Sequence, residues 1–586
     1  MNYNLNQISG KEEKKSTFAV LKKLLQLIAH ERKNLLLAFI AIVINSTLLL
    51  LSPLIIGHTI DNYVSTKQFN GVLLYSGILF IMYLVTLLTG YLQTKLMGGV
   101  GQRTLYTLRN AIFSKLQELP VSFFSQNKAG DLISRVNNDT DKLNQFFSQS
   151  LMQFLSSIFT MLGAGVFLLL INFKLGAATL APALVILIFT GLVSAWVKKK
   201  NAISLKSVGN LSAGIQESLS NFKVIIAFNR RDYFRKRFDE TNQQNYKTAI
   251  GAGIANTIFV PVFGFFSGAA QLIVLAYGIH LISIGEFTIG LLISYLSYAV
   301  NFYNPLRQLA ALWSSFQVAM AGWDRISQIL SLESDLQVIE DTNSDGLNEL
   351  LTFKNVHFSY TNGEEILHNI SFNLQKGKTY ALIGPTGGGK TTTASLMARL
   401  YDATKGNVFL NGRDIRSYTA EERSKKVGFI LQEPFLFTGT VKDNILYSNS
   451  AYKDYSNDQL EEVIKDAHLE GILALFDKGL DTEITSNSDS ISLGQKQLIA
   501  FMRAVLRSPE LLILDEATAN IDTITEQLLG SILNKLSKET TLVIIAHRLN
   551  TIENADEIYF VNEGEVQKAG TLNDALNMLL KGRRVS

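Results

Sequence analysis

Six long apolar runs occupy most of the first 320 residues, and they constrain the fold more than any other feature of the sequence. A helix needs about 20 mainly apolar residues to cross a hydrocarbon core of about 30 Å. The runs of this length are Leu35–Ile56, Val72–Leu92, Leu151–Ile171, Leu175–Trp196, Ile254–Ile284 and Thr288–Val318, the last two interrupted by Pro261, Pro305 and Arg307. We therefore predict an all-α membrane domain with six transmembrane helices.

Basic residues set the expected orientation of these helices. They gather before the first run and in the two long segments 93–150 and 197–253, whereas the short loops on the other side hold only Lys67 and Lys174. Cytoplasmic loops of membrane proteins carry an excess of Lys and Arg. We predict a multi-pass protein of the bacterial cytoplasmic membrane, with both termini and both long segments in the cytoplasm.

The two long segments have a helical pattern. Apolar residues recur at spacings of three and four, as in Leu105, Leu108, Ile112, Leu116 and Leu119. We expect the membrane helices to continue through these segments into the cytoplasm, where long helices can transmit force from a soluble domain.

Composition divides the chain into four segments. Residues 1–34 are polar and include an amphipathic stretch, Phe18–Ile28, expected to lie on the cytoplasmic membrane surface, with an ordinary surface helix as the alternative. No cleavable signal peptide is expected there. The transmembrane domain should span 35–332, a polar, acidic linker 333–346 and an α/β domain 347–586.

Composition also excludes several classes of function. The chain has no cysteine, so it can form no disulfide, zinc–thiolate site or cysteine nucleophile. Its net charge is only +4 and no basic block stands out, so no nucleic-acid partner is expected. None of the six runs contains Asp or Glu, which argues against an ion-coupled transporter.

A phosphate-binding loop follows the apolar strand Tyr380–Ile383. The run Gly384–Thr391 has the spacing G-x-x-x-x-G-K-[ST], and a helix follows it. Backbone N–H groups of such a loop and its helix N-terminus bind phosphate oxygens. Lys390 would reach the β- and γ-phosphates, and Thr391 would ligate Mg²⁺. The nucleotide-binding residues predicted here are Gly384, Thr386, Gly387, Gly388, Gly389, Lys390, Thr391 and Thr392.

Two further apolar strands end in polar residues. Leu511–Leu514 leads into Asp515, a candidate Mg²⁺ ligand, and Glu516, which could polarise the attacking water. Leu542–Ile545 leads towards His547. A lone histidine after a strand is commonly a cap or a core residue. Here three strands each lead into polar residues, which favours a functional role for His547 in the nucleotide site.

These motifs together resemble the ATP-binding cassette exporters of the six-span half-transporter class, along nearly the whole chain. Ile491–Gln495 is similar to the family signature LSGGQ, and Gln432 fits its glutamine loop. Tyr360 fits the aromatic residue that stacks on adenine. Other similar segments are Ala519–Asp522, the loop after the Mg²⁺ strand, and Leu119–Phe124 and Gly130–Arg135, in the first cytoplasmic loop.

The resemblance implies ATP and Mg²⁺ as cofactors, and an α/β P-loop nucleotide-binding domain. It assigns catalysis to Glu516, His547 and Gln432, and metal binding to Thr391, Gln432 and Asp515. It also implies that two ATPase domains hold two ATP molecules between them. Each ATP would lie between the phosphate loop of one domain and the signature of the other, here Ser492, Leu493, Gly494 and Gln495.

The sequence departs from the family pattern in two places, the signature and the stretch Thr485–Ser490 before it, which lacks the usual glycine-rich sequence. Ile491 and Leu493 stand where Leu and Gly are usual, whereas the phosphate loop, Glu516 and His547 fit the pattern. This combination resembles the catalytically competent subunit of heterodimeric bacterial multidrug exporters. The alternative is a homodimer in which the change is harmless.

The expected function is ATP-driven export of hydrophobic or amphipathic, multidrug-type compounds. The expected partners are a second half-transporter, membrane lipids and small amphipathic substrates. One alternative is a homodimeric lipid or peptide exporter. Another is an ATP-gated channel or regulator, which predicts ionic currents in a bilayer.

Overall fold

The computed structural model describes residues 3–5, 29–340, 349–360, 363–432, 434–485, 491–515, 523–536, 540–545 and 555–582. Its contacts divide the chain into two compact units. One contains residues 11–117 and 130–331, and the other contains residues 1–10, 118–129 and 332–586. The predicted amphipathic helix Phe18–Ile28 lies outside the described residues.

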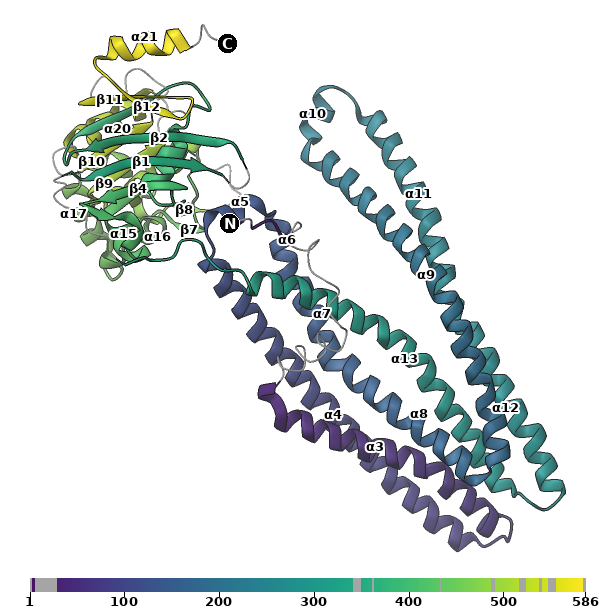
Figure 1. Ribbon diagram of the computed structural model, residues 1–586. Helices are drawn as coiled ribbons and strands as arrows, with labels where there is room; N and C mark the ends of the chain where they lie inside the picture. The colour runs from purple at the N-terminus through teal and green to yellow at the C-terminus, as the bar shows by residue number, and fades with distance from the viewer. Residues whose placement is uncertain are drawn as a thin grey trace. The chain divides into compact units, whose positions relative to one another are not determined.

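The first unit is entirely helical where it is described. Its long helices run along one another: α13 packs on α8 and α3, and α9 packs on α11 and α12 (Figure 1). The bounds are η1 (Ala29–Glu31), α3 (Arg32–Thr59), η2 (Ile60–Val64), α4 (Phe69–Glu118), α6 (Ala129–Ser134), η3 (Arg135–Asp139), α7 (Thr140–Gln145), η4 (Phe146–Ser150), α8 (Leu151–Ile171), α9 (Phe173–Ser220), α10 (Phe222–Ala227), α11 (Arg231–Thr257), α12 (Phe259–Ser283) and α13 (Ile289–Leu330).

Five helical segments of this unit are long and apolar enough to cross a membrane. They are Ala29–Val64, Phe69–Glu118, Ala129–Ile171, Phe173–Ser220 and Arg231–Ser283, and they cover five of the six predicted spans, the fifth except for its last residue, Ile284. The sixth predicted span, Thr288–Val318, lies in α13, a helix of 42 residues. Asn, Tyr and Ser residues lower the apolarity of this predicted span, which is not among the five. The predicted continuation of membrane helices through the long loops is confirmed, since α4 and α9 have 50 and 48 residues.

Three tyrosine hydroxyls of α13 tie it to other helices. Tyr295 donates to the carbonyl oxygen of Leu168 on α8 at 2.5 Å. Tyr298 and Tyr303 donate to carbonyl oxygens of α3 and α9 at 2.6 and 2.7 Å. A hydroxyl in an apolar layer needs a partner within the protein, because lipid offers none. These bonds therefore fix which face of α13 packs inside the unit.

A charged network joins the end of α13 to α6 and η3. Arg135, only 3% exposed, bonds Asp131 at 2.9 Å and the carbonyl oxygen of Arg325 at 2.6 Å. Arg325 in turn pairs with Asp131 and Asp139 at 2.5 and 3.2 Å. The motif Gly130–Arg135 thus holds the start of the third helical segment against α13.

The second unit is an α/β domain with additional pieces of chain. Its elements are α5 (Val121–Gln126), β1 (Leu351–Ser359), β2 (Glu365–Leu374), β3 (Thr379–Ile383), α14 (Lys390–Met397), β4 (Lys405–Leu410), β5 (Arg413–Asp414), η5 (Ile415–Ser417), α15 (Ala420–Lys426), β6 (Val427–Ile430), β7 (Gly439–Thr440), α16 (Val441–Leu446), η6 (Ser450–Tyr452), α17 (Asn457–Asp466), α18 (Glu470–Leu473), η7 (Gly479–Asp481), β8 (Glu483–Ile484), α19 (Leu493–Val505), β9 (Leu511–Asp515), α20 (Thr523–Leu536), β10 (Thr541–Ile545), β11 (Glu557–Asn562), β12 (Glu565–Ala569) and α21 (Leu572–Gly582).

Its main sheet has six strands in the order β12-β11-β3-β10-β9-β6. All neighbours are parallel except β11 and β12. Every residue of β3, β9 and β10 is buried, as expected for parallel strands covered on both faces. A second, antiparallel sheet has the order β2-β1-β4-β5.

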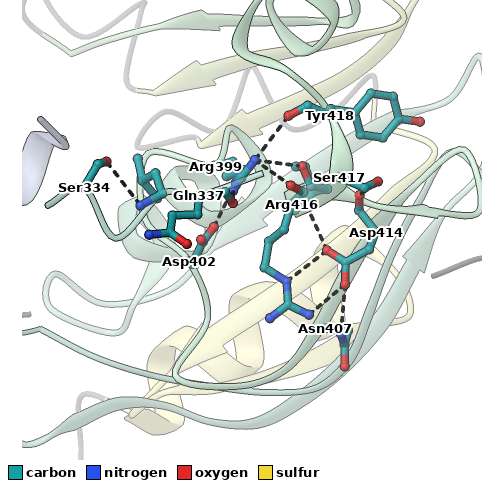
Figure 2. Close-up of polar contacts among 11 residues, drawn as sticks. Ser334, Gln337, Arg399, Asp402, Asn407, Asp414, Arg416, Ser417 and Tyr418 are labelled. Carbon is teal, nitrogen blue, oxygen red and sulfur yellow. Dashed lines mark hydrogen bonds and ion pairs between the residues drawn. The ribbon is translucent and has the colours of Figure 1, made fainter. Parts of the chain in front are cut away.

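The predicted linker is bound to this domain along its described part. Arg399, 2% exposed, donates to the carbonyl oxygens of Gln337 and Arg416 at 2.7 and 3.1 Å (Figure 2). Ile339 N–H donates to the same Arg416 carbonyl at 3.2 Å. Arg399 follows the end of α14, and α14 begins at the phosphate loop. One short helix therefore connects that loop to the chain that leaves α13.

The chain's N-terminal residues also belong to this unit. Tyr3 is fully buried, and its ring lies edge-on to Phe123 of α5. Its hydroxyl donates to the carbonyl oxygen of Glu333 at 3.0 Å and accepts from Asp335 N–H at 2.9 Å. Residues 118–129 were predicted as part of the transmembrane domain, but their contacts group them with the α/β domain. The predicted domain boundaries themselves remain predictions.

Candidate functional site

Four parallel strands end along one edge of the main sheet. In the neighbouring strands β3, β10 and β9, Ile545 pairs with both Leu382 and Asp515. On the far side of β9, Ile430 of β6 pairs with Leu514. The phosphate loop, Asp515 and Gln432 therefore all follow strand ends at this edge. Glu516, His547 and Ala519–Asp522 come next in the chain, but they lie outside the described residues.

Glycine is required where the loop turns away from β3. Gly384 and Gly389 have φ angles of 148° and 109°, in the region that L side chains rarely adopt. A Cβ at Gly384 would collide with the carbonyl oxygen of Val561 on β11, and one at Gly389 would lie 2.8 Å from Leu367. The loop is thus held tightly against β11 and β2, and α14 starts immediately after it.

Lys390 is the first residue of α14 and is 6% exposed. Its ammonium donates to the carbonyl oxygens of Gly384 and Pro385, both at 2.9 Å. The positive charge therefore lies directly over the loop, next to the backbone groups that would bind phosphate. A phosphate oxygen there would receive a charge-assisted hydrogen bond, which is stronger than a bond to a neutral carbonyl.

The oxygen ligands expected for Mg²⁺ lie next to the loop. Thr391 Oγ1 donates to Asp515 Oδ1 at 3.4 Å, although the two residues are 124 positions apart. Asp515 is 3% exposed. Hydroxyl and carboxylate oxygens are the ligands that this hard cation prefers, so the donor set fits Mg²⁺. Gln432 follows the adjacent strand β6, and its side chain is exposed.

Tyr360 follows β1 and lies beside α14. Its hydroxyl shares a hydrogen bond of 3.2 Å with Thr392 Oγ1, and its ring is edge-on to Tyr401 at 5.2 Å. The residue is 36% exposed, so part of the ring stays open for stacking. Burial of the rest raises the pKa of Tyr360 above its ordinary value, although the bond to Thr392 lowers it.

Tyr360→Phe is expected to leave ATP affinity nearly unchanged, whereas Tyr360→Ala should cost about 1–3 kcal/mol, the range for stacking of a base on an aromatic ring. The phenylalanine keeps the stacking ring and loses only the bond to Thr392. Thr392→Val also removes this bond, together with a hydroxyl predicted to bind nucleotide, so it should cost at least as much affinity as Tyr360→Phe. Titration of ATP by calorimetry measures all three variants. If Phe is as damaging as Ala, the hydroxyl matters and the stacking role is wrong.

The signature segment begins α19 with a reciprocal cap. Ser492 Oγ accepts from Gln495 N–H at 3.1 Å, and Gln495 Oε1 accepts from Ser492 N–H at 3.0 Å. The structure distinguishes the two unusual positions of the signature, whereas residues 486–490 before it lie outside the described residues. Ile491 is 7% exposed and fills the core as leucine would, whereas Leu493 is 41% exposed in the first turn. The apolar side chain at 493 therefore lies on the helix surface.

Two residues near the site were not predicted from the sequence. Tyr401 lies beside Tyr360. Gln497 of α19 is 1% exposed and donates to the carbonyl oxygen of Gln432 at 3.4 Å, which links the signature helix to the glutamine loop. A polar residue directly before the buried Leu498 and Ile499 was a signal that could have identified Gln497. Tyr401 had no such signal.

Two protein families match this chain. Residues 35–306 match the ABC transporter transmembrane region, and residues 367–519 match the ABC transporter family. These ranges correspond to the helical unit and to the domain that contains the phosphate loop, Asp515 and the signature. The match confirms a helical membrane region followed by an α/β nucleotide-binding domain.

Curated relatives match along almost the whole chain. YfiC, an uncharacterized ABC transporter ATP-binding protein of Bacillus subtilis, is 32% identical over 96% of this chain and 93% of its own length. An ATP-dependent lipid A-core flippase of Vibrio parahaemolyticus is 30% identical over 96% of both chains. A multidrug resistance ABC transporter ATP-binding and permease protein of Lactococcus lactis is 27% identical over 97% of this chain and 95% of its own. The chain therefore belongs to the ABC transporter family, as a half-transporter that joins one membrane region to one ATP-binding domain.

Proposed function

We propose that this chain is one half of a heterodimer that uses ATP to export hydrophobic or amphipathic compounds across the bacterial cytoplasmic membrane. The observation that carries the proposal is the sheet edge at which β3, β10, β9 and β6 all end. The phosphate loop, Thr391, Asp515 and Gln432 lie along that edge, on a chain that also contains membrane helices.

Family membership supplies the coarser part of this function. The chain is an ABC exporter of the multidrug, lipid or fatty acid type, and its ATP-binding domain couples ATP hydrolysis to transport. It is a membrane protein with a cytoplasmic ATPase domain, and half-transporters of this family work as dimers. The placement of both termini in the cytoplasm follows from the distribution of basic residues.

We assign the steps of hydrolysis to this chain's residues as follows. The loop N–H groups and Lys390 bind the β- and γ-phosphates, and Tyr360 stacks on adenine. Thr391, Asp515 and Gln432 would hold Mg²⁺, which would neutralise phosphate charge when bound. Glu516 would take a proton from the attacking water, and His547 is assigned to catalysis by its resemblance to the family motif.

The cargo assignment rests on the membrane half and on the relatives. The predicted spans are rich in Phe, Tyr and Leu, with Asn, Gln and Ser interspersed, which suits loosely specified, lipid-soluble cargo. Two relatives are named as a multidrug exporter and a lipid flippase. A homodimeric lipid or peptide exporter is the second candidate, supported by the flippase relative.

Transport by the purified pair in inside-out vesicles tests this function. ATP-dependent uptake of several unrelated amphipathic dyes is the expected result. Uptake of a fluorescent phospholipid alone would favour the dedicated lipid exporter instead. An ATP-dependent ionic current without uptake would replace the proposal with a channel.

Lys390→Ala is expected to weaken ATP binding by roughly tenfold or more, because a hydrogen bond to a charged group is worth about 1.5–3 kcal/mol. Lys378→Ala is the matched control, since Lys378 precedes the opposite end of β3 and pairs with Glu557 at 3.0 Å. Calorimetric titration of ATP measures both variants. Equal ATP affinity in the Lys390 variant and the unmodified chain would contradict the phosphate-loop assignment.

A further inference from the structure

Two segments of chain that lead into the membrane helices are both bound by one residue, Tyr3. Residues 118–129 follow α4 and lead into α6, and the linker that begins at residue 332 follows α13. Their contacts place both segments, together with residues 1–10, in the unit of the ATPase domain. Along the chain, movement of that domain can therefore reach α4 and α6 through the first segment and α13 through the second.

Side chains at the end of α5 hold the backbone of residues 3–5. Tyr3 N–H donates to Gln126 Oε1 at 2.9 Å. The Asn127 amide binds on both sides of Asn4: its Nδ2 donates to the carbonyl oxygen of Tyr3 at 2.9 Å, and its Oδ1 accepts from Leu5 N–H at 3.1 Å. Tyr3 and Leu5 are fully buried. Since buried backbone groups need hydrogen-bond partners, these bonds specify where residues 3–5 bind.

The side chain of Tyr3 extends this contact to the linker. Its hydroxyl donates to the carbonyl oxygen of Glu333 at 3.0 Å and accepts from Asp335 N–H at 2.9 Å, while its ring packs on Phe123 of α5. Burial and the nearby carboxylate of Asp335 raise the pKa of Tyr3 to about 12, so the hydroxyl stays protonated and can donate to Glu333. One tyrosine thus fixes the start of the linker to α5.

Further along, the linker is tied to the helix that follows the phosphate loop. Arg399 donates to the carbonyl oxygen of Gln337 at 2.7 Å, and α14 runs from Lys390 to just before Arg399 (Figure 2). Arg399 has a φ of 50°, in the left-handed region where glycine is usual after a helix. The bonds of its guanidinium, rather than its backbone, therefore favour arginine there. Contacts run from Lys390 through α14 and the linker to Tyr3 and α5.

We propose that Tyr3 is a positioning residue that couples ATP hydrolysis to transport by holding α5 and the linker together as one body. With Tyr3 bound, movement of the ATPase domain reaches α4, α6 and α13 together through a contiguous set of contacts. With Tyr3 released, α5 and the linker move separately, and ATP is hydrolysed without movement of cargo. This inference rests on the proposed export function and gives residues 3–5 a task outside the ATP site.

Release of the segment can be measured with a single thiol. Leu5→Cys places the only cysteine of this chain at a fully buried position, so the rate of its labelling by a maleimide reports release. In this background Tyr3→Phe keeps the ring and removes both hydroxyl bonds to the linker. Labelling should become roughly tenfold faster, the effect of losing two hydrogen bonds. Tyr3→Ala also removes the buried ring and should be labelled faster still.

Tyr559→Phe is the matched control. Tyr559 is buried within the ATPase domain, and its hydroxyl donates to the carbonyl oxygen of Asn373 at 3.1 Å. The variant therefore loses a buried bond of the same kind, away from residues 3–5 and the linker. Its labelling rate and its cargo stimulation should both equal those of the unmodified chain.

Coupling is measured with the functional dimer in vesicles, with ethidium and a fluorescent phosphatidylcholine as cargo probes. Tyr3→Ala, without the reporter cysteine, should lose transport of the probes and their stimulation of the ATPase. Its basal kcat and its KM for ATP should stay those of the unmodified dimer, because the ATP site is untouched. Tyr3→Phe should lie between the two.

Several results would overturn the inference. Faster labelling with unchanged cargo stimulation would separate the segment from coupling, and unchanged labelling in Tyr3→Ala would show that these contacts do not hold it. A fall of basal and stimulated turnover in the same proportion would make Tyr3 a residue that only stabilises the fold. If the unmodified dimer moves neither probe and neither stimulates its ATPase, the proposed export function and this inference fail together. If it moves a probe and Tyr3→Ala moves that probe equally well, only the inference about Tyr3 fails.

Discussion

Glu516→Gln is expected to reduce ATP turnover of the paired transporter by roughly 10²–10⁴-fold, the usual cost of removing a positioned general base. The substitution keeps the size and hydrogen-bonding shape of the side chain but removes its capacity to take a proton. Glu516 directly follows Asp515, which ends β9 beside the phosphate loop. ATP binding should persist, because Lys390 and the loop N–H groups are untouched. Steady-state phosphate release and ATP titration measure the two quantities separately.

Glu510→Gln is the control for this variant. Glu510 precedes the other end of the same strand, where it pairs with Lys426 at 2.5 Å and accepts from Asn411 at 2.9 Å. The same chemical change at that end should leave turnover almost unaltered. If Glu516→Gln hydrolyses ATP at half the normal rate or better, another group is the base. If both variants lose turnover equally, the loss reflects damage to the strand rather than to catalysis.

The local parts of this molecule could be predicted from the sequence. The strand–loop–helix at Tyr380–Thr391 was recognisable because each step is encoded within a few neighbouring residues: an apolar strand, glycines for positive φ, and a lysine that starts the helix. The face formed by Leu105, Leu108 and Ile112 was predicted from spacing alone, and all three are buried.

Contacts between distant segments could not be predicted in this way. Tyr3 bonds to Glu333 across 330 positions, and nothing in the composition of either segment indicates the partner. Tyr360 and Tyr401 meet because β1 and the end of α14 are neighbours in space, a fact set by sheet order rather than by local pattern. The linker prediction had a similar gap: a polar, acidic composition indicated a linker, but nothing in it indicated that Arg399 binds the linker's backbone carbonyl at Gln337.

This chain expressed alone is expected to show little cargo-stimulated ATPase activity, and co-expression with a different half-transporter should restore it. The argument begins at Leu493. In a homodimer both ATP molecules would meet the signature Ile491–Gln495, with an exposed leucine where glycine is usual. Loss of one hydrogen bond to a charged phosphate costs about 1.5–3 kcal/mol, so each site would lose roughly tenfold or more in turnover. Leu493→Gly should restore activity to the chain alone if this side chain is the cause.

In the heterodimer the two sites differ. The site built from this chain's phosphate loop and Glu516 would receive the partner's signature and turn over. The other site would combine Ile491–Gln495 with the partner's phosphate loop, and could hold ATP for long periods and keep the ATPase domains in contact between cycles. Activity should therefore require Glu516 but tolerate loss of the partner's equivalent carboxylate. A stable homodimer of this chain with full, cargo-stimulated ATPase would contradict the pairing, because Leu493 would then impair neither site.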